Sequence, residues 1–161
     1  MTQQNIHIAF EEYESIDQLN DEDAALLKEA IKATDIAYAP YSHFHVGAAA
    51  LLTNGKTISG SNQENASYPV GLCAERVLLS AASSVYPKVP IKTMAISYRP
   101  ENGLSNRPIS PCGVCRQTLV EYETLLNHPI RLILGGIEGK IWIIPKAGSL
   151  LPFGFSSDDL K

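Results

Sequence analysis

Three cysteines are the residues of this chain that most directly suggest a chemical function. Cys112 and Cys115 are three residues apart, and on a helix this spacing places both sulfurs on one face, close enough to share a metal ion. The same spacing occurs in redox proteins and in structural zinc sites. Cys73 adds a third thiolate, and the chain has no fourth cysteine. A tetrahedral zinc would then be completed by one of the four histidines or keep one position open for water, as catalysis requires.

Glu75 is the acid that could work beside such an ion. It follows Cys73 by two residues, too close to serve as a further ligand but well placed to reach a water on the metal. Zinc lowers the pKa of bound water from about 15.7 to about 7, and a neighbouring carboxylate can then accept and pass on the proton. An isolated glutamate here would indicate only an exposed acid in the first turn of a helix. Its position beside the cysteines favours a general base.

Charge balance is a further requirement of this centre. Three thiolate charges against the two of Zn²⁺ leave one negative charge, which weakens the acidification of water unless positive groups offset it. Arg76 and Arg116 are the candidates for this role.

Two predicted helices position the cysteines. Pro69 and Gly71 break the chain before a run of small and apolar residues at 73–85, which predicts a largely buried helix. A second helix is predicted over 111–126, with proline at its head. The cysteines thus fall at helix N-termini, where free backbone NH groups and the helix dipole favour thiolate over thiol.

The remaining elements predict a mixed α/β sandwich. A helix is expected over 21–39, with acids in its first turn and Pro40 directly after it. The turn signal Asn54-Gly55 predicts a hairpin between 46–53 and 56–62. Further strands are expected at 93–97, at the hairpin pair 130–134 and 140–144, and, from the alternation of Ile6, Ile8 and Phe10, at residues 5–10, with a short helix in the tail.

Composition narrows the class of protein. With 161 residues, 45% hydrophobic and 19% charged, the chain fits one globular domain, which we place at 21–161 after an N-terminal extension at 1–20. We expect a cytoplasmic protein, because the sequence has neither a membrane-length apolar run nor a secretion signal. The net charge of -4 makes nucleic acid a poor partner, and three cysteines speak against a disulfide framework.

Two motifs carry a resemblance to a known family. The sequences C-A-E at 73–75 and P-C-G-V-C-R-Q at 111–117 resemble the three-cysteine cytidine deaminases. Segments 37–49, 60–68 and 150–160 are similar to that family in the same order, so the resemblance covers roughly residues 21–160. It implies a three-layer α/β/α sandwich around a five-stranded mixed sheet, with room here for an extra N-terminal strand.

The resemblance also implies a reaction. One Zn²⁺ per subunit would serve hydrolytic deamination of cytidine and 2′-deoxycytidine, releasing ammonia in pyrimidine salvage. Proton transfer would fall to Glu75, with Cys73, Cys112 and Cys115 holding the metal. The other implied roles are Phe44 against the base, Asn62 and Glu64 on the ribose, Ala74 in the pocket, Tyr68 and Phe155 reaching a neighbour's site in a homotetramer, and Arg76 and Gln117 balancing charge.

Two departures and three rival functions qualify this interpretation. His45 stands where the family commonly has proline, and the first twenty residues have no counterpart in the minimal family core.

One rival is a deaminase of a modified cytosine nucleoside, but the pair Asn62 and Glu64 favours an ordinary ribose. A nucleic-acid cytosine deaminase would need a positively charged track. A structural zinc module would need a fourth protein ligand.

Overall fold

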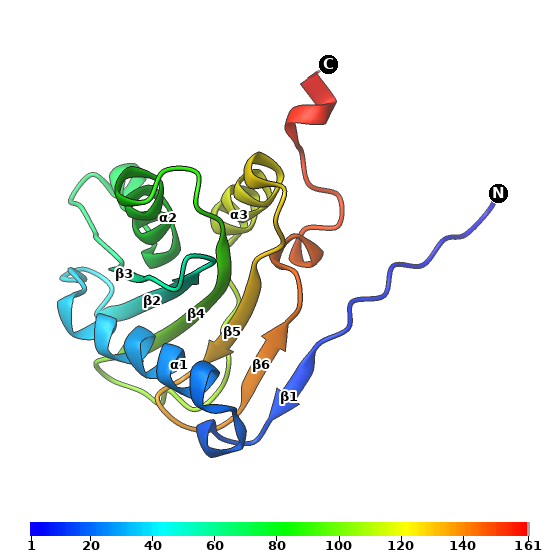
Figure 1. Ribbon diagram of the computed structural model, residues 1–161. Helices are drawn as coiled ribbons and strands as arrows, with labels where there is room; N and C mark the ends of the chain where they lie inside the picture. The colour runs from blue at the N-terminus through cyan, green and yellow to red at the C-terminus, as the bar shows by residue number, and fades with distance from the viewer. Residues whose placement is uncertain (161) are drawn as a thin grey trace.

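One mixed sheet of six strands forms the centre of the molecule. The computed structural model describes residues 1–160, and its strands run in the order β1-β6-β5-β4-β2-β3 (Figure 1). β4 and β5 pair in parallel, and the other neighbours pair antiparallel. The strands are β1 (Glu11–Tyr13), β2 (Phe44–Leu52), β3 (Thr57–Ser61), β4 (Ile91–Pro100), β5 (Arg131–Gly135) and β6 (Ile141–Ile144).

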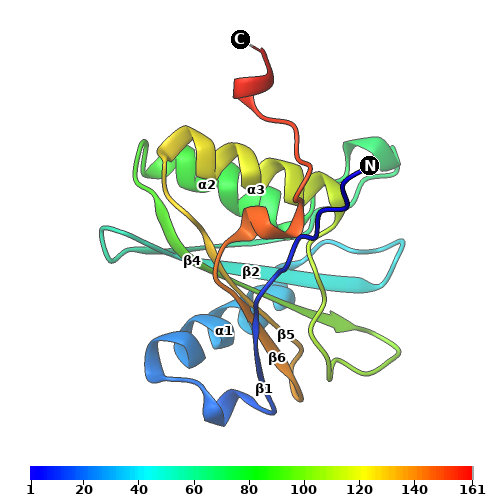
Figure 2. The ribbon, with the colours of Figure 1, turned by 90° about the vertical axis from the view of Figure 1, so that its right-hand side faces the viewer.

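Helices cover both faces of the sheet. α1 (Asp21–Ala33) lies on one face, while α2 (Ala74–Val85) and α3 (Gly113–Leu126) lie side by side on the other (Figures 1 and 2). Each face has its own apolar core, one centred on α1 and one beneath α2 and α3. The predicted three-layer α/β/α sandwich is therefore confirmed, with the extra strand making six.

Two glycines let the helices approach the sheet closely. A Cβ atom on Gly47 of β2 would lie 2.1 Å from the Ala30 carbonyl oxygen of α1. A Cβ atom on Gly60 of β3 would lie 2.7 Å from the Leu78 amide nitrogen of α2. Backbone atoms cannot yield to such contacts, so glycine at these positions sets how near α1 and α2 stand to the sheet.

Several predicted elements are confirmed with small shifts. The Asn54-Gly55 turn joins β2 to β3, with Gly55 at φ 79, and β5 and β6 form the second hairpin. α1 ends at Ala33 rather than at residue 39, because the chain tightens into a 3₁₀ turn over Thr34–Ile36 and then extends. The tail contains two short 3₁₀ helices, Ala147–Leu150 and Ser157–Leu160.

The position predicted for the N-terminal strand is wrong. Residues 1–10 form no strand, and the strand that joins the sheet is β1 at Glu11–Tyr13, paired with β6. The alternation of Ile6, Ile8 and Phe10 is present, but no neighbouring strand in this chain pairs with it. Glu12 instead fastens β1, because its carboxylate accepts hydrogen bonds from Lys140 Nζ at 2.6 Å and Trp142 Nε1 at 2.8 Å. The division of the chain at residue 20 stays a prediction.

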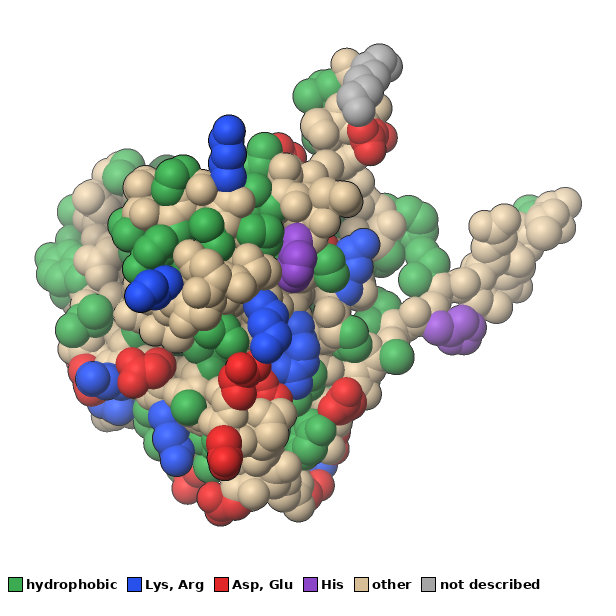
Figure 3. Space-filling model, in the orientation of Figure 1, with side chains coloured by type: hydrophobic (Ala, Val, Ile, Leu, Met, Phe, Trp, Pro, Cys, Tyr) green, Lys and Arg blue, Asp and Glu red, His purple; other side chains and the backbone are tan. Residues whose placement is uncertain are grey.

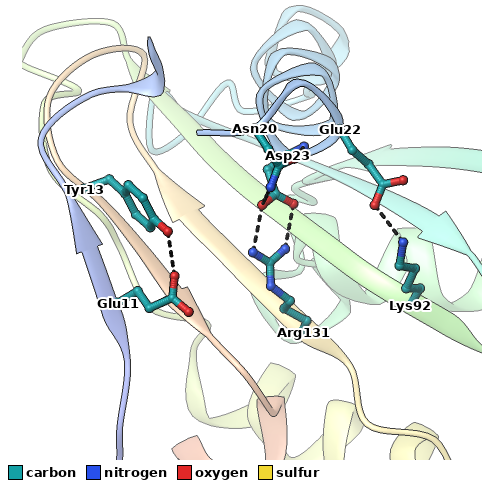
Figure 4. Close-up of polar contacts among 7 residues, drawn as sticks. All are labelled: Glu11, Tyr13, Asn20, Glu22, Asp23, Lys92 and Arg131. Carbon is teal, nitrogen blue, oxygen red and sulfur yellow. Dashed lines mark hydrogen bonds and ion pairs between the residues drawn. The ribbon is translucent and has the colours of Figure 1, made fainter. Parts of the chain in front are cut away.

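A half-buried ion pair ties α1 to β5. Nη1 and Nη2 of Arg131 donate to the Asp23 carboxylate, at 2.6 and 2.7 Å (Figure 4). Asn20 caps α1 by accepting from the Asp23 amide at 2.9 Å. Burial by itself would raise the pKa of Asp23, but the hydrogen bonds from Arg131 outweigh it and hold the pKa below the usual value.

We expect Asp23→Asn to lower the free energy of unfolding at pH 7 by about 2–3 kcal/mol, between the values for surface and buried ion pairs. Because the folded pKa is lowered, the carboxylate's contribution is complete above the unfolded pKa of about 3.9 and is lost as pH falls through the folded value. Urea unfolding of both proteins over a pH series should show the difference shrink below about pH 4.

Glu22→Gln is the matched control. Glu22 pairs with Lys92 at 2.7 Å from the same helical turn, but both side chains are more than half exposed (Figure 4). Its loss should cost less than about 1 kcal/mol. Equal losses in the two variants would contradict the importance assigned to the Asp23–Arg131 pair.

Candidate active site

The three cysteines converge at one point although they come from distant parts of the chain. Cys73 Sγ lies 3.7 Å from Cys112 Sγ, across 39 residues of sequence, and Cys112 Sγ lies 3.5 Å from Cys115 Sγ. All three sulfurs lie within 4.8 Å of one another. None is part of a disulfide. The predicted metal-ligating residues are thus brought together.

This arrangement fits zinc. Sulfur atoms about 2.3 Å from a tetrahedral ion lie about 3.8 Å from each other, close to the two measured separations. The cluster includes no histidine and no carboxylate among the described residues. A fully enclosed structural site would require a fourth protein ligand, so the donor set favours a centre with an open position.

Both groups of ligands sit at helix N-termini, as predicted. Cys73 is the N-cap residue of α2, and Cys112 is the N-cap residue of α3. The positive end of each helix dipole therefore lies at the sulfur cluster, where it stabilises thiolate. Hydrogen bonding from Cys115 lowers the pKa of Cys73 to about 6, whereas the same bond raises the pKa of Cys115.

Glu75 lies in the first turn of α2, beside the sulfurs. Its side chain is 4% exposed, and burial raises the pKa of its carboxyl group above the usual value. Interactions with its own backbone amide and with Cys115 oppose this rise in pKa but do not outweigh burial. A buried carboxyl group whose pKa moves toward neutrality can both accept and donate a proton.

A pocket of about 530 Å³ opens beside this cluster. Its lining includes Cys73, Glu75 and Cys112 at one part of its wall. Four of the residues predicted to contact substrate also line it: Phe44, Asn62, Glu64 and Tyr68. Phe44 stacks on Tyr98, with ring centroids 5.2 Å apart and an interplanar angle of 22°, so its ring is supported from behind.

Asn62 and Glu64 also hold the backbone of the pocket. The Asn62 side chain accepts from Val46 N at 2.8 Å and donates to Phe44 O at 2.9 Å. Glu64 Oε2 accepts from the amides of Tyr41 and Ser42, which leaves Oε1 for other partners. Hydrogen bonds from Ser42 and Tyr41 lower the pKa of Glu64 despite an opposing desolvation effect, so it is an anion at neutral pH.

The remaining predicted residues lie outside the pocket lining. Ala74 is fully buried. The charge of Arg76 contributes to the lowered pKa of Cys73, in line with a charge-balancing role. Gln117, in contrast, donates to the Phe155 carbonyl at 2.6 Å and so fastens the C-terminal segment. The roles of these residues in charge balance and substrate binding stay predictions.

Arg116, the other candidate for charge balance, contacts backbone carbonyl groups, and its role in charge balance stays a prediction. Its guanidinium donates to Pro111 O at 2.8 Å and to Leu150 O at 3.3 Å. These bonds join the start of α3 to the C-terminal segment. Arg116 therefore acts here as a structural link between the loop before Cys112 and the tail.

Sequence reasoning missed part of the pocket wall. Ile109 and Ser110 line the pocket just before Cys112, and Leu72 lines it just before Cys73. Their closeness in sequence to the metal ligands was the available signal. Ser42, Val46 and Gln63 also line the pocket and lie in the segments that resemble the family, although no role was predicted for them. Gly71 and Ile96 line it from outside those segments.

Comparisons with known proteins agree with this geometry. Residues 20–125 match the family described as the cytidine and deoxycytidylate deaminase zinc-binding region. A cytidine deaminase from Halalkalibacterium halodurans is 41% identical over 136 residues, covering 84% of this chain and 96% of that protein. One from Mycobacterium tuberculosis is 37% identical, covering 81% of this chain and 87% of that protein.

A solved structure extends the agreement to the fold. The crystal structure of cytidine deaminase from Burkholderia pseudomallei superposes with a TM-score of 0.72 at 35% identity, covering 85% of this chain and all of that one. A cysteine triad beside a buried glutamate at the N-termini of paired helices defines a zinc hydrolase site. The chain belongs to the cytidine and deoxycytidylate deaminase family.

We expect the purified protein to carry one zinc per chain, and Cys115→Ser to weaken zinc binding by more than about 100-fold, because it removes one of three protein ligands. Competition against a chromophoric chelator would measure the affinity. Ser110→Ala, a change in the pocket wall that removes no ligand, should leave the affinity unchanged. Tight zinc binding by the Cys115→Ser protein would contradict the assigned donor set.

Proposed function

We propose that this chain is a zinc-dependent hydrolytic deaminase that converts cytidine and 2′-deoxycytidine to uridine and 2′-deoxyuridine with release of ammonia. One observation carries the proposal: Glu75 lines the same pocket as Cys73 and Cys112, two of the three cysteines of the metal cluster. Membership of the family and the names of the relatives support the choice of a cytosine nucleoside.

The base would enter with its amino-bearing carbon toward the cysteines. When bound, zinc lowers the pKa of water so that it can attack near neutral pH. Glu75 accepts a proton from the attacking water and transfers it to N3 of cytosine as oxygen adds to C4. Glu75 then carries a second proton to the amino group, the C4–N bond breaks, and ammonia leaves. One water is consumed for each ammonia released.

The sugar would lie at the opposite part of the pocket. The free oxygen of Glu64 suits a ribose hydroxyl donor, and the Asn62 amide can accept or donate beside it. Phe44, supported by Tyr98, offers a flat apolar surface to the base. A single hydroxyl satisfies this arrangement as well as a pair does, so both the ribose and the deoxyribose nucleoside fit.

A free nucleoside suits the surface better than a nucleic acid does. The net charge is -4, and on the face seen in Figure 3 acidic and basic side chains are interspersed. A polynucleotide substrate requires a continuous positive path for its phosphates.

The described helices include none long and apolar enough to cross a bilayer.

We also propose that the chain works as a homotetramer in the cytoplasm. Tyr68 lines the pocket mouth yet is 74% exposed, and Phe155 is 56% exposed, so both are available to a neighbouring subunit. Reduced cysteines are required to hold the metal, and a reducing compartment preserves them.

Glu75→Gln should retain zinc but lower turnover of cytidine by about 10²–10⁴-fold, because glutamine keeps the shape of the side chain and cannot carry a proton. Loss of absorbance as cytidine is consumed, together with zinc analysis, would measure both properties. Glu121→Gln makes the same change on the exposed face of α3 and should leave turnover unchanged. A zinc-loaded Glu75→Gln protein with full activity would refute the assignment.

Substrate choice can be tested with the unmodified protein. Cytidine and 2′-deoxycytidine, added separately, should each lose absorbance and release ammonia in equal amounts, whereas adenosine should do neither. A cytosine nucleoside antibiotic should react more slowly, because its modified sugar cannot meet Asn62 and Glu64 in the same way. Turnover of adenosine alone would overturn the substrate assignment.

A further inference from the structure

An extended arm precedes the sheet and contacts little of its own chain. Residues 1–10 lead away from β1 and stand clear of the globule (Figures 1 and 3). Fully extended, ten residues reach about 33 Å. Ile6, Ile8 and Phe10 are 54%, 42% and 50% exposed. Their period-two spacing puts all three on one side of an extended chain.

The root of this arm is held in a defined direction. The Phe10 ring packs on Trp142 of β6, with centroids 5.3 Å apart at 57°. Glu12 accepts hydrogen bonds from Lys140 and from the same Trp142. Trp142 packs with the core beneath α2 and α3, so the apolar side of the arm faces that side of the sheet. We call Ile6, Ile8 and Phe10 the arm stripe.

The arm lies before the part of the chain that matches the family model. The family match begins at residue 20, and the Halalkalibacterium halodurans relative is covered over 96% of its length by 136 residues of this chain. Exposed isoleucines at regular spacing nevertheless indicate a surface that becomes buried against a partner.

The nature of the partner follows from charge and symmetry. Residues 1–10 contain no Asp, Glu, Lys or Arg, so the arm offers a strongly charged partner nothing to pair with. The C-terminal segment also projects from the globule and exposes Phe153 and Phe155 (Figures 1 and 2). A second copy of the chain offers these exposed apolar side chains to the arm. Two copies related by a two-fold axis make the same contact twice, so each copy contributes one arm and binds the arm of the other.

We propose that the arm stripe docks on a second copy of this chain, so that neighbouring subunits exchange their N-terminal arms. This inference rests on the proposed association of the chain with itself, but not on the proposed reaction. The Phe10–Trp142 contact and the Glu12 hydrogen bonds set the direction of the arm. Ile6 and Ile8 provide the apolar area that becomes buried in the contact.

The test uses the full chain loaded with zinc. The double variant Ile6→Ser/Ile8→Ser should raise the apparent dissociation constant between subunits by about tenfold or more, because two buried aliphatic side chains are lost. Gln3→Ser/Gln4→Ser is the matched control within the same arm and should leave association unchanged. Sedimentation velocity over a concentration series measures both, with circular dichroism and zinc content as checks on folding.

The outcomes separate this inference from the proposed function. If the full chain associates and the isoleucine variant associates equally well, the arm proposal is overturned while the assembly stands. A full chain that stays monomeric overturns both, whereas cytidine turnover tests the reaction independently.

A crosslinking experiment tests contact directly. A photoreactive benzoylphenylalanine replacing Ile8 in one isotopically labelled population, mixed with unlabelled chains, should give crosslinks that join the two isotopes. Crosslinks confined to a single chain, or no crosslinks, would overturn the proposal. This readout does not depend on catalytic activity.

Discussion

The site depends on the convergence of two helix N-termini on one small volume. Cys73 caps α2 and Cys112 caps α3, while Cys115 lies in the first turn of α3, so the positive ends of both helix dipoles meet at the sulfurs. Such a meeting requires both helices to lie on the same face of the sheet with fixed height and direction. Gly60 allows α2 to sit close on β3, and the core beneath α2 and α3 locks their spacing. A displacement of about 1 Å in either helix would break the sulfur geometry.

The surroundings of Glu75 and Cys73 shift the pKa values of these two side chains in opposite directions. Burial disfavours the charged form of Glu75, while hydrogen bonds and helix NH groups favour the thiolate form of Cys73. Two acidic groups that are close neighbours in sequence therefore have pKa values shifted in opposite directions. This difference suits Cys73 to hold a metal ion as thiolate and Glu75 to carry a proton, and it arises from the different surroundings of the two side chains.

Local patterns predicted local structure well. The Asn54-Gly55 turn, the hairpin of β5 and β6, and the starts of α2 and α3 follow from short-range propensities and are confirmed. The strand predicted at residues 5–10 is wrong because alternation shows only that a segment could pair, not that a partner strand is within reach. Likewise, α1 stops at Ala33 because a 3₁₀ turn replaces its last predicted turn.

The sequence by itself determined the chemistry available: a thiolate pair three residues apart, and a glutamate two residues after a third cysteine. Those relations depend on helix geometry alone, so they can be read without a fold. Only the tertiary structure decided that Cys73 meets Cys112 across 39 residues, that Glu75 is buried in the pocket, and that Gln117 and Arg116 reach the tail. Contacts between distant segments depend on how whole layers pack, and residue spacing carries no record of that packing.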